Sequence, residues 1–163
     1  MPPETTYIDR RSTLRAISAI GLGSLVAGCL GDDDVTPDDD IPEEVHEFLD
    51  GNNANEYDGT LADATGQSEV TVENGAGGQG FAYDPPVLKV DVDTTVVWEW
   101  TGRGGSHNVV SRSESEFEFE SDGGDLIAEA GHTFEYMFEE PGIAYYECTA
   151  HVAQGQVAVV IVE

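Results

Sequence analysis

The sequence predicts an all-β protein, a Greek-key β-sandwich of about eight short strands. Apolar and polar residues alternate through most of the chain after residue 56, which is the period of a strand with one buried face. Clusters of glycine, proline and aspartate interrupt the alternation at short intervals. No apolar stripe with helical spacing is visible, and this many short strands in roughly a hundred residues are typical of a sandwich.

The expected strands follow one another along the chain. Apolar runs with strand character lie at residues 70–72, 88–92, 97–100, 134–138, 143–146 and 157–162. Turn residues separate them at 74–80, 84–86, 102–105, 122–124 and 141–142. The segment Gly75–Gly80 also satisfies the dinucleotide pattern G-x-G-x-x-G, but two prolines and a further strand follow it instead of a helix. We therefore interpret it as a flexible hairpin loop.

Residues 1–28 have the pattern of an export signal. Arg10 and Arg11 precede an uncharged stretch at residues 16–27, and small residues lead up to Cys29. The apolar stretch is shorter than the roughly 20 residues that span a bilayer. The adjacent arginines resemble a twin-arginine signal, a route for proteins that are already folded. The end of the segment resembles a lipobox, so Cys29 is expected to carry a lipid anchor; the alternative is an ordinary signal peptide with an incidental cysteine.

Composition separates two further parts of the chain. Residues 29–55 are rich in Asp, Glu, Pro and Asn and have few apolar side chains, which predicts a disordered acidic tether. The folded domain is then expected over residues 56–163. The chain has 33 acidic and 6 basic residues and a net charge of -27, which excludes binding to nucleic acid. Acidic side chains continue through the domain, so we expect the fold to need high salt, which screens their repulsion.

Three side chains with metal-binding chemistry mark the expected site. Cys148 and His151 are three residues apart after the aromatic strand, and His107 follows a glycine turn far upstream. Two imidazoles and one thiolate in a plane, with a weak fourth ligand along the axis, are the donors of a blue-copper electron-transfer site. A Cys-x-x-His pair alone is weak evidence. The upstream His-Asn, the all-β pattern and the export signal strengthen it.

These motifs resemble those of the plastocyanin-like cupredoxins and, within them, the halocyanins, the acidic membrane-tethered copper proteins of halophilic archaea. The resemblance implies that His107, Cys148 and His151 are the copper ligands. It also implies that Asn108 braces the ligand loop against Thr149, a contact that fixes ligand orientation. It covers about residues 55–163 and depends on residues 57–59, 81–86, 96–102, 105–110, 131–134 and 145–151.

One position departs from the family pattern. The family usually has methionine as the axial ligand eight residues after the cysteine, and this sequence has Gln156 there. A glutamine oxygen is an accepted axial donor. Because it is harder than a thioether, it is expected to favour Cu(II) and to lower the reduction potential. The alternative is that Gln156 faces water and that copper has three ligands. Met137 and His132 are not expected to bind copper.

The resemblance implies an electron carrier with one copper ion, and not an enzyme. Single electrons would pass between membrane-bound respiratory donor and acceptor proteins on the outer face of the cell membrane. The exposed edge of His151, with Val152 and Ala153, would form a small transient contact surface. We expect a lipid-anchored monomer. The alternatives are copper storage or delivery, a zinc-binding or metal-free domain, and a small catalytic copper domain, in that order.

Overall fold

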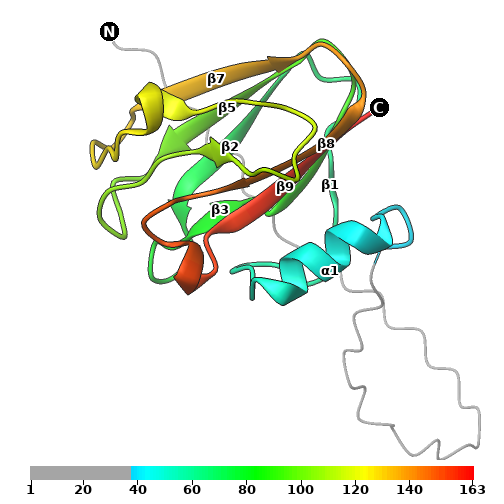
Figure 1. Cartoon of the computed structure of the whole chain (residues 1–163). Coiled ribbons are helices and arrows are strands. Elements are labelled where there is room, and N and C mark those ends of the chain that lie inside the picture. Colours follow the sequence, from blue (N-terminus) through cyan, green and yellow to red (C-terminus); the bar gives the residue numbers. More distant parts are fainter. Residues whose placement is uncertain (1–37) are drawn as a thin grey trace, which may run out of the picture. The chain divides into compact units, whose positions relative to one another are not determined.

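The computed structural model describes residues 38–163 and is shown in Figure 1. The predicted export signal, Cys29 and the first part of the predicted tether lie outside the described residues. Among residues 38–163, no helix is long and apolar enough to cross a membrane.

The described residues form two β-sheets with nine strands in all, which confirms the predicted sandwich. One sheet has the order β1 (Ala62–Asp63), β4 (Val87–Val90), β9 (Val157–Val162), β8 (Gly142–Glu147) and β6 (Val110–Ser111). The other sheet has the order β3 (Ala82–Asp84), β2 (Glu69–Ala76), β5 (Thr94–Trp100) and β7 (Thr133–Phe138). Two short 3-10 helices, η1 (Ser121–Gly124) and η2 (Val152–Gln154), lie in the loops.

The main core lies between the two sheets. Strand β5 alternates as the sequence predicts, with Val96, Trp98 and Trp100 buried toward the core. Trp98 packs edge-on against Tyr146 of β8 in the opposite sheet, with ring centroids 5.4 Å apart. The hairpin interpretation of the glycine-rich segment is confirmed, because β2 and β3 pair antiparallel on either side of it. Its first residues, Gly75 and Ala76, still belong to β2.

Strand β9 does not alternate, because all six of its residues are buried. It pairs with β4 in parallel and with β8 antiparallel, so it is a central strand. Strands that are buried on both faces have continuous apolar sequences. One face of β9 meets the core between the sheets. The other face is covered by a helix, in the segment where the sequence predicts a tether with at most a short helical turn at residues 45–49.

This helix, α1 (Glu43–Gly51), corrects the predicted extent of the tether. Val45 and Leu49 are buried in a second apolar cluster with side chains of β8 and β9. Figure 1 shows α1 lying beside β9. Two glutamates in the first turn interact favourably with the helix dipole. The acidic composition concealed the signal, since Ile41, Val45 and Leu49 are spaced four residues apart, as on one helix face. The folded domain therefore begins well before residue 56.

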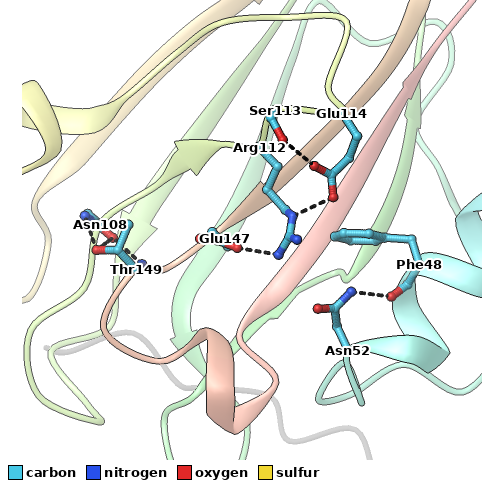
Figure 2. Close-up of polar contacts among 8 residues, drawn as sticks. All are labelled: Phe48, Asn52, Asn108, Arg112, Ser113, Glu114, Glu147 and Thr149. Atoms are coloured by element: carbon cyan, nitrogen blue, oxygen red, sulfur yellow. Dashed lines mark hydrogen bonds and ion pairs between the residues drawn. The ribbon is translucent and has the colours of Figure 1, made fainter.

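Phe48 also attaches α1 to the sheet, and Figure 2 shows its ring beside the Arg112 side chain. Phe48 packs edge-on against Tyr145 of β8, with ring centroids 4.8 Å apart. The Arg112 guanidinium lies 5.3 Å from the centre of the Phe48 ring. Arg112 also binds Glu147, the residue before Cys148, with an N–O distance of 2.5 Å. The helix is thus linked through Arg112 to the strand end that presents the cysteine.

Replacing Leu49 by alanine tests whether α1 is part of the folded domain. We expect Leu49→Ala to lower the free energy of unfolding by about 2–5 kcal/mol, the usual cost of deleting a buried leucine side chain. Denaturant unfolding in high salt measures this loss. The exposed Glu47→Ala in the same helix is the matched control and should change stability by less than about 0.5 kcal/mol. Equal stability of the two variants would mean that residues 43–51 are a tether.

Candidate metal centre

The predicted ligands lie together at one end of the sandwich. His107 lies in the connection between β5 and β6, and backbone hydrogen bonds in both directions pair it with Ile127. Cys148 directly follows β8, and Gln156 directly precedes β9. Because these two strands pair antiparallel, the loop between them closes, and the Cys148 N–H donates to the Gln156 carbonyl over 3.1 Å. His151 lies within this closed loop.

Three donor atoms converge at the distances that one metal ion requires. His107 Nδ1 and His151 Nδ1 are 3.2 Å apart, and Cys148 Sγ lies 3.9 and 3.5 Å from them. Bonds of about 2.0 Å to nitrogen and about 2.3 Å to sulfur, as Zn²⁺ makes, set donor separations of about 3.5–3.8 Å around a trigonal centre. The donor set therefore fits a single late first-row metal ion. Among residues 38–163, these are the three His, Cys, Asp or Glu side chains that meet in this way.

The backbone fixes which nitrogen of His107 faces the other donors. His107 Nε2 donates to the Arg103 carbonyl over 2.6 Å, which leaves the Nδ1 lone pair directed into the site. Gly75 of β2 makes room for this contact, because a Cβ there would lie 2.9 Å from the Arg103 oxygen and 3.2 Å from Nε2. The Trp100 indole also donates to the His107 carbonyl over 3.1 Å. The ring thus has a defined tautomer and orientation.

Gln156 lies in the interior with the other donors and does not face water. Its side chain is fully buried, and its Oε1 is 2.9 Å from His107 Nδ1. Its amide nitrogen points the opposite way and donates to Asn74 Oδ1 over 2.9 Å. Two nitrogen lone pairs, a sulfur and an amide oxygen are therefore directed at one another. Four electron-pair donors in one buried space need a cation among them, either a proton or a metal ion.

The pKa shifts of the metal-free ligands agree with this arrangement. Burial raises the pKa of the Cys148 thiol, but hydrogen bonds from His107 and from the Asn108, Ala150 and His151 backbone outweigh it, so the pKa lies below its usual value. Burial lowers the pKa of His107, but its hydrogen bonds with Cys148 and Arg103 raise it overall. The lowered thiol pKa favours formation of the thiolate, which is the form of cysteine that binds metal. A metal ion that binds there displaces a proton.

Asn108 makes the contact with Thr149 that the sequence motifs implied. Its Oδ1 accepts from the Thr149 N–H over 2.9 Å, and its Nδ2 donates to Thr149 Oγ1 over 3.0 Å and to the Gly124 carbonyl over 2.9 Å. Figure 2 shows the two residues joined across the gap between their loops. The Tyr83 hydroxyl donates to the Asn108 carbonyl over 2.6 Å from within the core. These bonds connect the residue after His107 to the residue after Cys148.

Comparison with known proteins identifies the family. Residues 69–163 match the sequence model of the family described as "copper binding proteins, plastocyanin/azurin family". Halocyanin from Natronomonas pharaonis is 48% identical to the chain over 163 residues, which cover 96% of the chain and 98% of halocyanin. The chain belongs to the plastocyanin/azurin family of copper-binding proteins. His107, Cys148 and His151 are accordingly the type 1 copper site of this cupredoxin, and the family consists of small electron carriers and not enzymes.

Solved structures of lower similarity include two other cupredoxins. Oxidized plastocyanin from Dryopteris crassirhizoma is 21% identical, with a TM-score of 0.48 over 58% of this chain and 100% of plastocyanin. A purple cupredoxin from Nitrosopumilus maritimus is 30% identical, with a TM-score of 0.45 over 60% of this chain and 100% of that protein.

Several contacts around the copper site of this cupredoxin were not predicted from the sequence. Asn55, just after α1, donates through its side chain to the Phe81 carbonyl over 2.7 Å and to the Gln154 carbonyl over 2.6 Å. Its backbone N–H donates to the Gly155 carbonyl over 2.9 Å. The Phe81 ring in turn packs on the His151 ring, with centroids 4.6 Å apart. Asn55 thus holds the ligand loop beside the hairpin that supports His151.

The remaining histidine and methionine candidates lie away from the donor atoms, as expected from the sequence. His132 binds Asp122 over 2.8 Å and packs on Trp100, and it is not a member of the cluster of donor atoms. Met137 is 51% exposed on the outer side of β7. Neither residue contributes to the copper site.

Replacing Gly75 tests how closely the site depends on its backbone. We expect Gly75→Ala to destabilise the cupredoxin by more than the roughly 1–2 kcal/mol that a left-handed alanine costs, because the new Cβ also meets the Arg103 carbonyl. Loss of the His107–Arg103 hydrogen bond should weaken copper binding by about 10–100-fold. Unfolding and copper competition titrations measure the two effects.

Gly66→Ala is the matched control for this experiment. Gly66 also has a positive φ, of 83°, but a Cβ added there would meet nothing within 4 Å, so only the backbone strain applies. Copper affinity should be unchanged in this variant. An equal loss of affinity in both variants would contradict the role of the close approach at Gly75.

Proposed function

We propose that this cupredoxin carries single electrons between membrane-bound redox partners on the outer face of the cell membrane. The observation that carries the proposal is the difference in exposure among the ligands. His107, Cys148 and Gln156 are fully buried, and His151 is half-buried. A buried redox centre with one ligand edge at the surface favours electron exchange and hinders exchange of the metal.

The residues around the site restrict its rearrangement. Bound copper would supply a one-electron couple between Cu(I) and Cu(II). Arg103 fixes the ring of His107, and Asn108 fixes the two loops relative to each other. The closed turn between β8 and β9 fixes Cys148 and Gln156. Donors that stay in place in both oxidation states keep the reorganisation cost of electron transfer low.

The contact surface for partners would surround His151. The half-buried Val152 and the exposed Ala153 follow His151, and the Phe81 ring lies against its imidazole. Apolar neighbours around an exposed ligand edge suit a small, short-lived contact. We therefore infer that electrons enter or leave through His151, as a monomer docks on each partner in turn.

Gln156 is proposed as the axial ligand. The proposal is supported by its burial and by the direction of its amide oxygen, which faces His107 Nδ1. A hard oxygen on the axis favours Cu(II), so the reduction potential would be lower than with a thioether.

Attachment to the membrane is proposed through a lipid at Cys29. It is supported by the sequence pattern of residues 1–28 and by the 48% identity to halocyanin along nearly the whole chain. With the folded domain starting near Ile41, the segment from Cys29 to the domain would span at most about 40 Å even if fully extended. Such a short connection would keep the copper site near membrane-bound partners.

The optical spectrum after addition of Cu(II) in high salt tests the redox proposal. We expect an intense visible thiolate-to-copper band, which a reductant bleaches and an oxidant restores over repeated cycles. Cys148→Ser should abolish the band because it removes the thiolate. His132→Gln is the matched control and should retain it. Release of copper on reduction would favour storage or delivery, and a colourless zinc protein would contradict electron transfer.

Replacement of Gln156 by methionine tests the axial ligand. We expect Gln156→Met to raise the reduction potential, since the softer thioether stabilises Cu(I) relative to Cu(II). The exposed Gln154→Met, two residues away, is the control and should leave the potential unchanged. Voltammetry measures both variants. An unchanged potential in Gln156→Met would remove Gln156 from the coordination of copper.

A further inference from the structure

Asn74 is a buried polar residue on an otherwise apolar strand face. The inward positions of β2 are Val70, Val72 and Asn74. An amide therefore faces the core at a position where the alternation predicts an apolar side chain. Asn74 is fully buried. Its backbone is held in place because its carbonyl accepts from the Thr101 N–H over 2.9 Å. The side chain therefore extends from a rigid strand end.

The Asn74 side chain reaches the opposite sheet. Its Oδ1 accepts the hydrogen bond from Gln156 Nε2 at 2.9 Å, between residues 82 positions apart in the chain. Its own Nδ2 has no hydrogen-bond partner among the described residues. A buried donor without a partner is unfavourable for stability. Asn74 thus makes its side-chain hydrogen bond to Gln156, while its own unpaired NH₂ group lowers the stability of the fold.

This contact matters because the two ends of the Gln156 amide are chemically different. The oxygen has lone pairs that it can give to a metal ion, and the NH₂ group is a donor of hydrogen bonds only. While Asn74 Oδ1 accepts from Nε2, the oxygen must point toward His107 Nδ1, as it does. Without an acceptor at residue 74, a half-turn of the amide would direct the NH₂ group at the copper ion.

We propose that Asn74 is a positioning residue that orients the Gln156 amide, so that oxygen and not nitrogen faces the copper ion. The inference rests on the proposed axial role of Gln156. It assigns part of the control of the reduction potential to a residue that is not itself a ligand.

The test measures reduction potentials of Asn74→Leu and Asn74→Asp. Leucine has a similar size and accepts no hydrogen bond, so we expect the potential to rise toward that of Gln156→Met. A tenfold loss of preference for Cu(II) corresponds to about 59 mV in a one-electron couple. Asn74→Asp retains the acceptor oxygen, so its potential should not rise. Thr94→Val, which alters a buried polar residue at the start of the neighbouring strand β5, controls for loss of core stability.

The same substitutions in the Gln156→Met background separate this inference from the axial proposal. Methionine has no amide to orient, so Asn74→Leu should add no comparable shift there. If Gln156→Met alone leaves the potential unchanged, the axial proposal fails. If Gln156→Met raises the potential and Asn74→Leu does not, or if Asn74→Leu acts equally in both backgrounds, the role of Asn74 is overturned.

Hydrogen exchange in the metal-free protein tests the contact without copper. It also provides a test with a second variant in case Asn74→Leu folds poorly. In the metal-free protein, the Gln156 side-chain NH₂ protons should exchange slowly with solvent while Asn74 accepts them. Asn74→Thr suits a strand, but its short hydroxyl does not reach Gln156. Nuclear magnetic resonance should show faster exchange in this variant and in Asn74→Leu. Unchanged exchange in Asn74→Thr would overturn the proposed contact.

Discussion

The structure around the site depends on the convergence of four electron-pair donors in a buried space. His107, Cys148, His151 and Gln156 repel one another electrostatically unless a cation lies among them. Their positions are therefore held from outside. The antiparallel pairing of β8 and β9 closes the loop that carries three of them, and the Arg103 carbonyl fixes the fourth.

Both sheets and the N-terminal helix contribute to this support. Strand β2 brings Asn74 to Gln156, and the missing side chain at Gly75 lets the same strand pass under His107. Asn55 holds the far side of the ligand loop, directly after α1 has packed on β8 and β9. The helix thus protects the outer face of the sheet and also places the segment that restrains the loop. Elements of both sheets and the N-terminal segment therefore all help to position the ligands.

The residues of the site that could be predicted from the sequence are those whose side chains are themselves metal-binding groups. His107, Cys148 and His151 could be predicted because their imidazole and thiolate groups are the donors of a blue-copper site and their surrounding motifs resemble those of the family. The backbone carbonyl of Arg103 has no sequence signature. Asn74 was missed because its partner lies on the other sheet, and a single polar residue in an alternating strand does not reveal that partner. A short helical turn at residues 45–49 was the most that the sequence suggested, and the full length and packing of helix α1 were missed because acidic residues surround its buried face.

The most direct test is a crystal structure of the copper-loaded protein with anomalous scattering measured at the copper edge. The account predicts one strong peak among His107 Nδ1, Cys148 Sγ and His151 Nδ1, with Gln156 Oε1 on the axis and its Nε2 still bound to Asn74. A peak elsewhere, or a Gln156 side chain turned away from the ion, would contradict it.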